Sequence, residues 1–165
     1  MADQVDRIRA QWAAQRPDLD VSPMGVIGRI QRLSRLVDAE IRRTFAKHGL
    51  DTASFDVLAT LRRSDPPHRL TPAELMRSSM VTSGAITQRL DRLQARGLVT
   101  RAPSDSDGRG VHVTLTEAGF SLVEAVLPDH LATENRLLAA LPPERLATLA
   151  DELRVLLESL GDTPR

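Results

Sequence analysis

The stretch D-S-D-G-R-G-V-H-V-T-L-T-E-A-G, residues 105–119, decides the fold. Its first part, 105–110, is charged and contains two glycines, which is typical of a loop tip, whereas apolar and polar residues alternate over 111–115 as in a half-buried strand. Residues 98–101 predict a partner strand on the other side of this loop. The sequence therefore predicts a β-hairpin that carries Arg109 at its tip.

Two short helices are predicted directly before this hairpin. The residues T-P-A-E (71–74) fit a capping box, in which the threonine hydroxyl and the glutamate carboxylate bond backbone N–H groups at the helix start. A second helix is expected from Thr82, as its N-cap, to Gly97. Its apolar residues at helical spacing are Ile86, Leu90 and Leu93. Two short helices joined by a tight turn form a helix-turn-helix, and a hairpin that follows one is a wing.

Further helices are predicted before this region. Val5, Ile8 and Trp12 recur at helical spacing and indicate a short N-terminal helix. Ser22, as N-cap, and Pro23 begin a long helix that ends near residue 49. Thr52 is expected to cap the helix after it.

The sequence after the hairpin also predicts helices. Thr116 caps a helix that Pro128 is expected to kink or interrupt. The pair Pro142-Pro143 precedes a last helix with a leucine seam. The seam consists of Leu146, Leu149, Leu153, Leu156 and Leu160. Such a seam suits another helix, either in the same chain or in a second copy.

These elements predict a mainly α protein with a small β-hairpin wing, built as a winged helix-turn-helix lobe plus a helical dimerisation region. Residues 1–50 would hold the N-terminal helix and the long first helix of the dimerisation region. Residues 51–116 would form the lobe, and residues 117–165 would supply the C-terminal helices that complete the dimerisation region.

Composition excludes several function classes. The chain has 165 residues, no cysteine and four histidines without an H-x-x-x-H pair, so we expect neither a metal site nor a cofactor. The chain contains no apolar run of the roughly 20 residues that a membrane span needs, and residues 1–10 do not resemble a signal peptide. We therefore expect a cytoplasmic protein without a membrane partner. No nucleophile and base are recognisable together, so we do not expect an enzyme.

Charge is distributed unevenly although the formal net charge is zero. Residues 77–110 hold six arginines against three aspartates, whereas residues 117–165 hold four arginines against nine acidic residues. The guanidinium of arginine is better suited than the ammonium of lysine to form paired hydrogen bonds with phosphates and base edges. A high arginine content can also reflect a GC-rich genome. The basic segment coincides with the predicted helix-turn-helix and wing.

The outer face of the second short helix is small and polar. Thr87 and Gln88 can hydrogen-bond base edges, and Arg92 can bond guanine or a phosphate. At the helix start, Gly84 permits close approach to a groove, and Thr82 and Ser83 offer hydroxyls and backbone N–H groups to a phosphate. The alternative is that this face is only a solvated polar surface.

Arg109 at the hairpin tip can reach into the minor groove of DNA, where A·T-rich sequence has enhanced negative potential. Asp107 can pair with Arg109 or with an arginine of the helix and hold the tip in shape. For an isolated hairpin a solvated tip would be the better interpretation. Here the hairpin directly follows a helix-turn-helix, which favours the DNA-contacting role.

Three segments resemble the MarR (multiple antibiotic resistance regulator) family of dimeric winged-helix repressors. They are L-T-P-A-E-L (70–75), V-T-S-G-A-I-T-Q-R-L-D-R-L-Q-A-R-G-L-V-T-R (81–101) and D-G-R-G-V-H-V-T-L-T-E-A-G (107–119), and the resemblance covers roughly residues 25–160. It implies a homodimer on a pseudo-palindromic operator, with the 82–96 helix of each protomer in the major groove and Arg109 in the minor groove. Gly110 departs from the family pattern, because many members carry a second basic or bulky residue there.

The N-terminal sequence is similar to one branch of the family, which contains urate-responsive regulators with an extra N-terminal helix. The segments that carry this similarity are V-D-R-I-R-A-Q-W (5–12), P-D-L-D-V-S-P-M-G-V-I-G-R (17–29) and F-D-V-L-A-T-L-R-R (55–63). The resemblance implies a pocket for a urate-like, small anionic or aromatic ligand, lined by Trp12, Asp56 and Arg89. The alternative is that Trp12 anchors the extra helix while Asp56 and Arg89 form an ordinary salt bridge.

Two function classes follow from these observations. The first is a ligand-responsive transcriptional regulator that binds double-stranded DNA as a homodimer, in keeping with a repressor. The second is a helical dimeric protein-interaction module whose winged helix does not bind DNA specifically, which Gly110 and the zero net charge favour.

Overall fold

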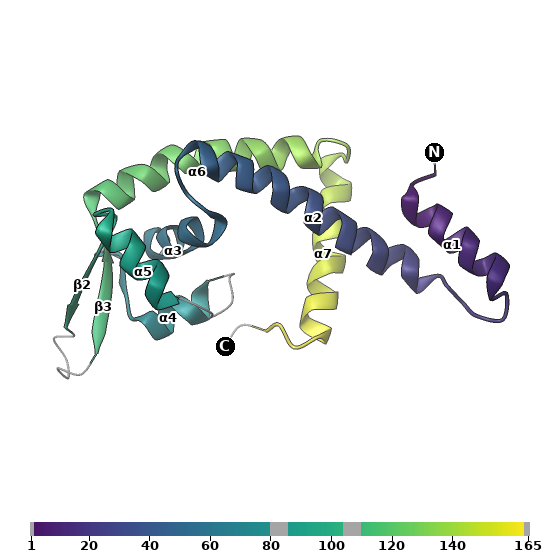
Figure 1. Ribbon diagram of the computed structural model, residues 1–165, viewed down its shortest axis with the longest axis horizontal. Helices are drawn as coiled ribbons and strands as arrows, with labels where there is room; N and C mark the ends of the chain where they lie inside the picture. Colours follow the sequence, from purple (N-terminus) through teal and green to yellow (C-terminus); the bar gives the residue numbers. More distant parts are fainter. Residues whose placement is uncertain (1, 80–85, 104–109, 164–165) are drawn as a thin grey trace. The chain divides into compact units, whose positions relative to one another are not determined.

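The computed structural model describes residues 2–79, 86–103 and 110–163 (Figure 1). The described elements, in chain order, are α1 (Gln4–Gln15), α2 (Pro23–Lys47), α3 (Thr52–Arg62), β1 (Arg69–Leu70), α4 (Pro72–Ser78), α5 (Ile86–Ala95), β2 (Val99–Pro103), β3 (Val111–Leu115), α6 (Glu117–Leu138) and α7 (Pro143–Ser159). The protein is mainly helical with a small antiparallel sheet, which confirms the predicted fold class. The chain divides into two compact units, residues 1–40 and residues 41–165.

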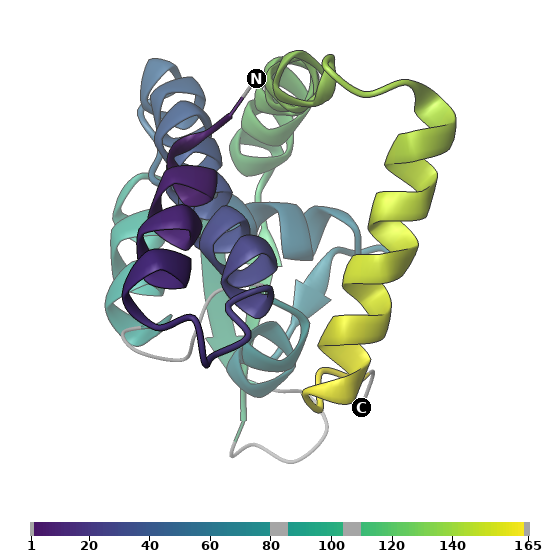
Figure 2. The ribbon, with the colours of Figure 1, turned by 90° about the vertical axis from the view of Figure 1, so that its right-hand side faces the viewer.

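The first unit contains α1 and most of α2, which run side by side in opposite directions (Figure 2). Asp3 caps α1 in a capping box with Asp6. The Val5 side chain is buried, and a Cβ built on Gly28 of α2 would lie 3.2 Å from it. Glycine at this position therefore lets the two helices approach closely. The predicted N-terminal helix is confirmed, and it is longer than the apolar spacing indicated.

One of the predicted helix caps is wrong. The N-cap of α3 is Asp51, whose carboxylate accepts a hydrogen bond from the Ser54 N–H, and Thr52 is the first helical residue. The aspartate next to the threonine takes the hydrogen bond, since an ionised carboxylate is the stronger acceptor. α2 begins at Pro23 as expected, and the hydroxyl of the preceding Ser22 donates to the Asp20 carboxylate, 2.9 Å away.

The second unit contains the predicted helix-turn-helix and wing. Thr71 and Glu74 form the expected capping box at the start of α4. α5 is followed by Gly97, whose φ of +68° is the left-handed conformation typical of a helix C-terminus. β2 and β3 pair antiparallel as the predicted hairpin, with Val99 opposite Leu115. Residues 80–85 and 104–109, which hold the expected start of the second helix and the wing tip, lie outside the described residues.

A third strand joins this hairpin. β1 pairs antiparallel with β3, so the order in the sheet is β1-β3-β2. β1 was not predicted, because its two residues are too few to show an alternating pattern. The strand ties the chain just before α4 to the wing.

One core holds the second unit together. It is made of buried side chains from α2, α3, α4, α5, α6 and the sheet, and its largest members are Phe45, Leu58, Leu61, Leu75, Leu90 and Leu93. Leu90 and Leu93, two of the three apolar residues predicted on one side of α5, are among them, and the third, Ile86, is partly buried against the core. The α5 helix is thereby fixed by one face and leaves its other face exposed.

The two C-terminal helices differ in how they are buried. α6 runs without interruption through Pro128, so of the two expected effects, a kink or an interruption, the interruption is absent. Pro128 is exposed, and water can therefore bond the carbonyl group that loses its N–H partner. α7 contains no buried residue. None of the described helices has the length and apolar character needed to cross a membrane.

Candidate nucleic-acid interface

The α5 helix separates its apolar and polar residues onto opposite faces. Leu90 and Leu93 are at most 2% exposed in the core, while Thr87, Gln88 and Arg92 are exposed. The exposed residues offer a hydroxyl, an amide and a guanidinium, which are the groups that bond base edges and phosphates. The arrangement follows the helical period, and it leaves the predicted DNA-contacting side chains of α5 accessible.

The remaining predicted contacts to DNA lie outside the described residues. They are Thr82, Ser83, Gly84 and Arg109, together with Asp107, the residue expected to stabilise the wing. Their roles stay predictions.

The wing is attached to α5 by Arg101 of β2. Its Nε donates to Gln94 Oε1 and its Nη2 donates to Asp91 Oδ1, both at 2.5 Å. Asp91 and Gln94 are three residues apart on α5 and so point to the same side of the helix. From the sequence, Arg101 is recognisable only as part of the basic segment, because its partners are seven and ten residues away in another element.

The base of the wing is packed tightly against the start of α6. The Thr116 hydroxyl donates to the Gly97 carbonyl at 2.7 Å, and the Thr116 N–H donates to the Leu98 carbonyl at 3.2 Å. A Cβ built on Gly119 would lie 2.1 Å from the Leu98 carbonyl oxygen. Only glycine fits this position without a backbone shift, and α6 thereby fixes where β2 begins.

The three predicted ligand-binding residues lie in three helices. Trp12 is in α1, within the first unit, and its side chain is 46% exposed. Asp56 is buried in α3 and Arg89 is half-buried in α5, both within the second unit. The described residues contain no group of three side chains that could hold a metal ion.

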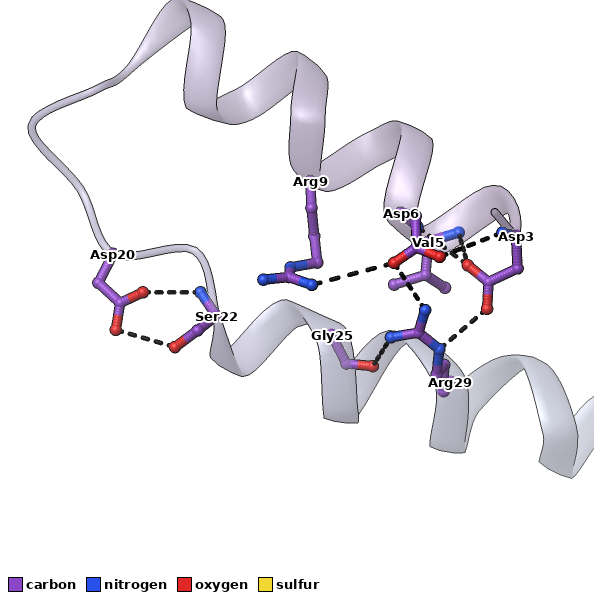
Figure 3. A network of polar contacts seen from close by, with 8 residues as sticks. All are labelled: Asp3, Val5, Asp6, Arg9, Asp20, Ser22, Gly25 and Arg29. Atoms are coloured by element: carbon purple, nitrogen blue, oxygen red, sulfur yellow. Dashed lines mark hydrogen bonds and ion pairs between the residues drawn. The ribbon is translucent and has the colours of Figure 1, made fainter. Parts of the chain in front are cut away.

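An ion-pair cluster holds α1 on α2 (Figure 3). Arg29 of α2 donates from Nε to Asp3 Oδ2 at 2.9 Å and from Nη2 to Asp6 Oδ1 at 2.7 Å. The pKa of the Asp6 carboxyl is lowered, with the Arg29 hydrogen bond as the largest cause. The pKa of Asp3 is lowered too, mainly by the hydrogen bond from the Asp6 N–H and in part by Arg29. The cluster fixes the helix that carries Trp12, and sequence spacing did not reveal it.

Comparison with known proteins decides the family. Residues 48–110 match the model of the MarR family. The HTH-type transcriptional regulator PecS from Dickeya dadantii is 39% identical over 141 residues, which cover 86% of this chain and 85% of that protein. The chain belongs to the MarR family. Its relatives are transcriptional regulators and not enzymes.

Solved structures of MarR-family proteins share the fold. AbsC, a MarR family transcriptional regulator from Streptomyces coelicolor, superimposes with a TM-score of 0.79 at 25% identity over 88% of this chain and 98% of AbsC. A mutant MarR from E. coli, complexed with operator DNA, has a TM-score of 0.71 at 27% identity over 94% of this chain and 99% of its own. In this MarR-family protein, α4 and α5 are therefore the helices of the helix-turn-helix, and β2 and β3 form the wing.

Proposed function

We propose that this MarR-family protein is a homodimeric repressor that binds a pseudo-palindromic operator and is released by a small anionic ligand such as urate. The observation that carries the proposal is the exposed polar face of α5 beside a wing that is attached to it. The E. coli MarR mutant, a protein of the same fold, has been crystallised with operator DNA.

In the proposed complex α5 lies in the major groove. Thr87 and Gln88 bond base edges, and Arg92 bonds guanine or a phosphate. Gly84 allows the helix start to approach the groove, while Thr82 and Ser83 bind a backbone phosphate. These proposed roles follow from the lengths of the side chains. Short side chains contact the DNA where the helix is closest to it, and the longer arginine contacts the DNA where the helix leaves the groove.

The wing contacts the DNA beside this groove. Arg109 enters the minor groove, and Asp107 holds the wing tip in the conformation that presents it. The net positive charge of residues 77–110 assists the approach of the lobe to DNA.

The proposed ligand site combines Trp12, Asp56 and Arg89. A planar anion would stack on the indole of Trp12 and pair with the Arg89 guanidinium, whereas the buried Asp56 would be repelled by it. A ligand that binds one conformation of the chain and is repelled by another shifts the equilibrium toward the conformation that binds it. Release from DNA would be the outcome of that shift.

The first experiment measures binding of the purified protein to the intergenic DNA beside its own gene, at two salt concentrations, with and without urate. We expect specific binding that weakens as salt rises, since phosphate contacts release counterions, and that urate abolishes. A scrambled duplex of the same length is the control. Weak, salt-insensitive binding to both duplexes would favour the alternative, an interaction module that does not recognise DNA.

The ligand part of the proposal has its own test. The Trp12→Ala variant is expected to bind the same DNA normally but to resist release by urate. Met24→Ala is the matched control, because Met24 is another exposed apolar side chain of the first unit. Unchanged urate-induced release from Trp12→Ala would remove Trp12 from the ligand site.

A further inference from the structure

The contact between the wing and α5 includes Asp91, an acidic residue of the described α5 helix. Asp91 is the one acid in Ile86–Ala95, and it lies between Gln88 and Arg92 on the exposed side of the helix. Its side chain is 54% exposed, so its charge is open to solvent on at least one side. A bare carboxylate at this place would repel the phosphates of any DNA that α5 approaches.

Arg101 covers this carboxylate from the wing. The Arg101 side chain is 29% exposed, and its guanidinium bonds both Asp91 and Gln94 from a residue in the middle of β2, so it engages two consecutive turns of α5. A planar guanidinium with two bonds at fixed angles restricts the orientation of the strand more than a single contact does. The same interaction therefore affects both the orientation of β2 and the charge at Asp91.

We propose that Arg101 is a positioning residue for DNA binding: it fixes the wing strand β2 on α5 and neutralises Asp91 on the side of the helix that faces DNA. The proposal rests on the proposed DNA-binding function. It assigns to Arg101 a role within the protein, so that its guanidinium acts on DNA through Asp91 and the wing and is not itself a reader of bases.

The test of the electrostatic role is a double-mutant cycle of DNA affinity at low salt. We expect Arg101→Ala to weaken binding about tenfold and Asp91→Ala alone to change it by less than about threefold. The double variant is expected to bind DNA more tightly than Arg101→Ala. This gain in DNA affinity must exceed the change in affinity that Asp91→Ala causes in the wild-type protein. Binding by Arg101→Ala within about twofold of the wild type, or no recovery in the double variant, would overturn the neutralising role.

The control for loss of one positive charge is Arg16→Ala. Arg16 also bonds an aspartate with Nε and Nη2, at 2.8 and 2.6 Å to Asp18, but it lies in the first unit outside the winged helix. We expect it to retain wild-type affinity within about twofold, because its charge is not opposed to an acid of α5. An equal loss in Arg16→Ala and Arg101→Ala would show that only the net charge matters, which contradicts the proposal.

The test of the geometric role does not need DNA. Amide hydrogen exchange of residues 99–103 and 111–115 is expected to be faster in Arg101→Ala than in the wild type, while exchange of α3 is unchanged. Arg101→Lys keeps the positive charge but loses the planar guanidinium that forms two hydrogen bonds. It should therefore retain most of the DNA affinity, while its wing amides still exchange faster than those of the wild type. Unchanged exchange in both variants would overturn the positioning role. If the wild type binds no DNA, the proposed function and the neutralising role fall together, while the exchange experiment still decides the positioning role.

Discussion

Gly119 shows how one residue fixes the base of the wing. Because its missing Cβ would lie 2.1 Å from the Leu98 carbonyl oxygen, Gly119→Ala forces the start of α6 away from β2. We expect this substitution to lower the free energy of unfolding by about 3 kcal/mol, the upper range for added volume in a packed site. Urea unfolding of both proteins at one protein concentration measures the difference.

Gly97→Ala is the matched control for this prediction. Gly97 has a φ of +68° but no atom within 4 Å of a built Cβ, so its substitution carries backbone strain without a clash. We expect a loss of about 1 kcal/mol, the ordinary cost of a left-handed conformation for a residue with a Cβ. If the two variants lost equal stability, the close approach at Gly119 would not be the reason for glycine there.

Gln88 is the residue at which we expect DNA sequence to be read. It is exposed on α5, and its amide can bond two positions of an adenine at once. Gln88→Ala should weaken binding to the operator about tenfold while nonspecific binding stays unchanged, since no charge is lost. Competition titrations with operator and scrambled duplexes measure both quantities.

Arg92→Ala is the contrasting variant at the same scale. Because an exposed arginine can bond a phosphate, its loss is expected to weaken both kinds of binding and to make the salt dependence shallower. A Gln88→Ala variant that behaved in the same way as Arg92→Ala would contradict a base-reading role for Gln88.

Among the elements, those with many turns or strong local signals could be predicted from the sequence. The periodic leucines of α5, the capping box of α4 and the alternation in β3 each lie within about ten consecutive residues, so local rules suffice. β1 was missed because it has two residues, and the Arg29 and Arg101 contacts were missed because their partners are distant in the sequence. The cap at Thr52 was wrong because the adjacent Asp51 accepts the hydrogen bond from the Ser54 N–H.

The candidate site was predictable to a similar degree. The exposed positions of Thr87, Gln88 and Arg92 follow from the helical period once the buried face of α5 is known. The groups that orient the interface do not follow from a period, since Arg101 and Gly119 act through contacts between elements. Sequence therefore indicates which side chains can meet a ligand better than it indicates what holds them in place.

The α1 helix is expected to depend on its ion-pair cluster. α1 has 12 residues, too few for a stable isolated helix in water, so contacts with α2 must support it. Arg29→Ala leaves Asp3 and Asp6 without their partner on α2. We expect faster amide hydrogen exchange of residues 4–15 at pH 7, with exchange of α3 unchanged. Arg7→Ala is the control, because Arg7 is an α1 arginine that bonds Gln4 of the same helix.

The same cluster gives a pH dependence with a definite sign. The pKa values of Asp3 and Asp6 are lowered from their ordinary value of 3.8, so their contribution to α1 docking is present above that pH and is lost as pH falls through the lowered values. In the wild type we expect the protection of residues 4–15 against exchange to fall only below about pH 4, whereas in Arg29→Ala this protection is already low at neutral pH. Protection of α1 that persists unchanged in Arg29→Ala would assign the docking to Val5 and Gly28 alone.

At the scale of the whole molecule, the most unusual feature is the exposed apolar surface of the long helices. α7 has no buried residue, and Leu153, Leu156 and Leu157 are exposed on two consecutive turns of it. In the first unit, Ile27 and Leu33 of α2 are also more than half exposed. Exposed apolar patches of this kind mark interaction surfaces, so each of these two helix faces suits an interface with a second copy.

The proposed dimerisation leads to a prediction that connects the exposed leucines of α7 with DNA binding. Leu153→Glu places a charge among the exposed leucines, and burying that charge without a partner costs enough to weaken the dimer about 100-fold. Light scattering should then show a monomer at micromolar concentration. Because a monomer engages one half-site at a time, we expect operator affinity to fall about 100-fold while the salt dependence per protomer is kept. Leu19→Glu is the control, since Leu19 is also an exposed leucine but lies in the segment between α1 and α2. A Leu153→Glu variant that is monomeric but binds the operator as tightly as the wild type would show that one protomer suffices for recognition, and the proposed homodimeric repressor would then be wrong.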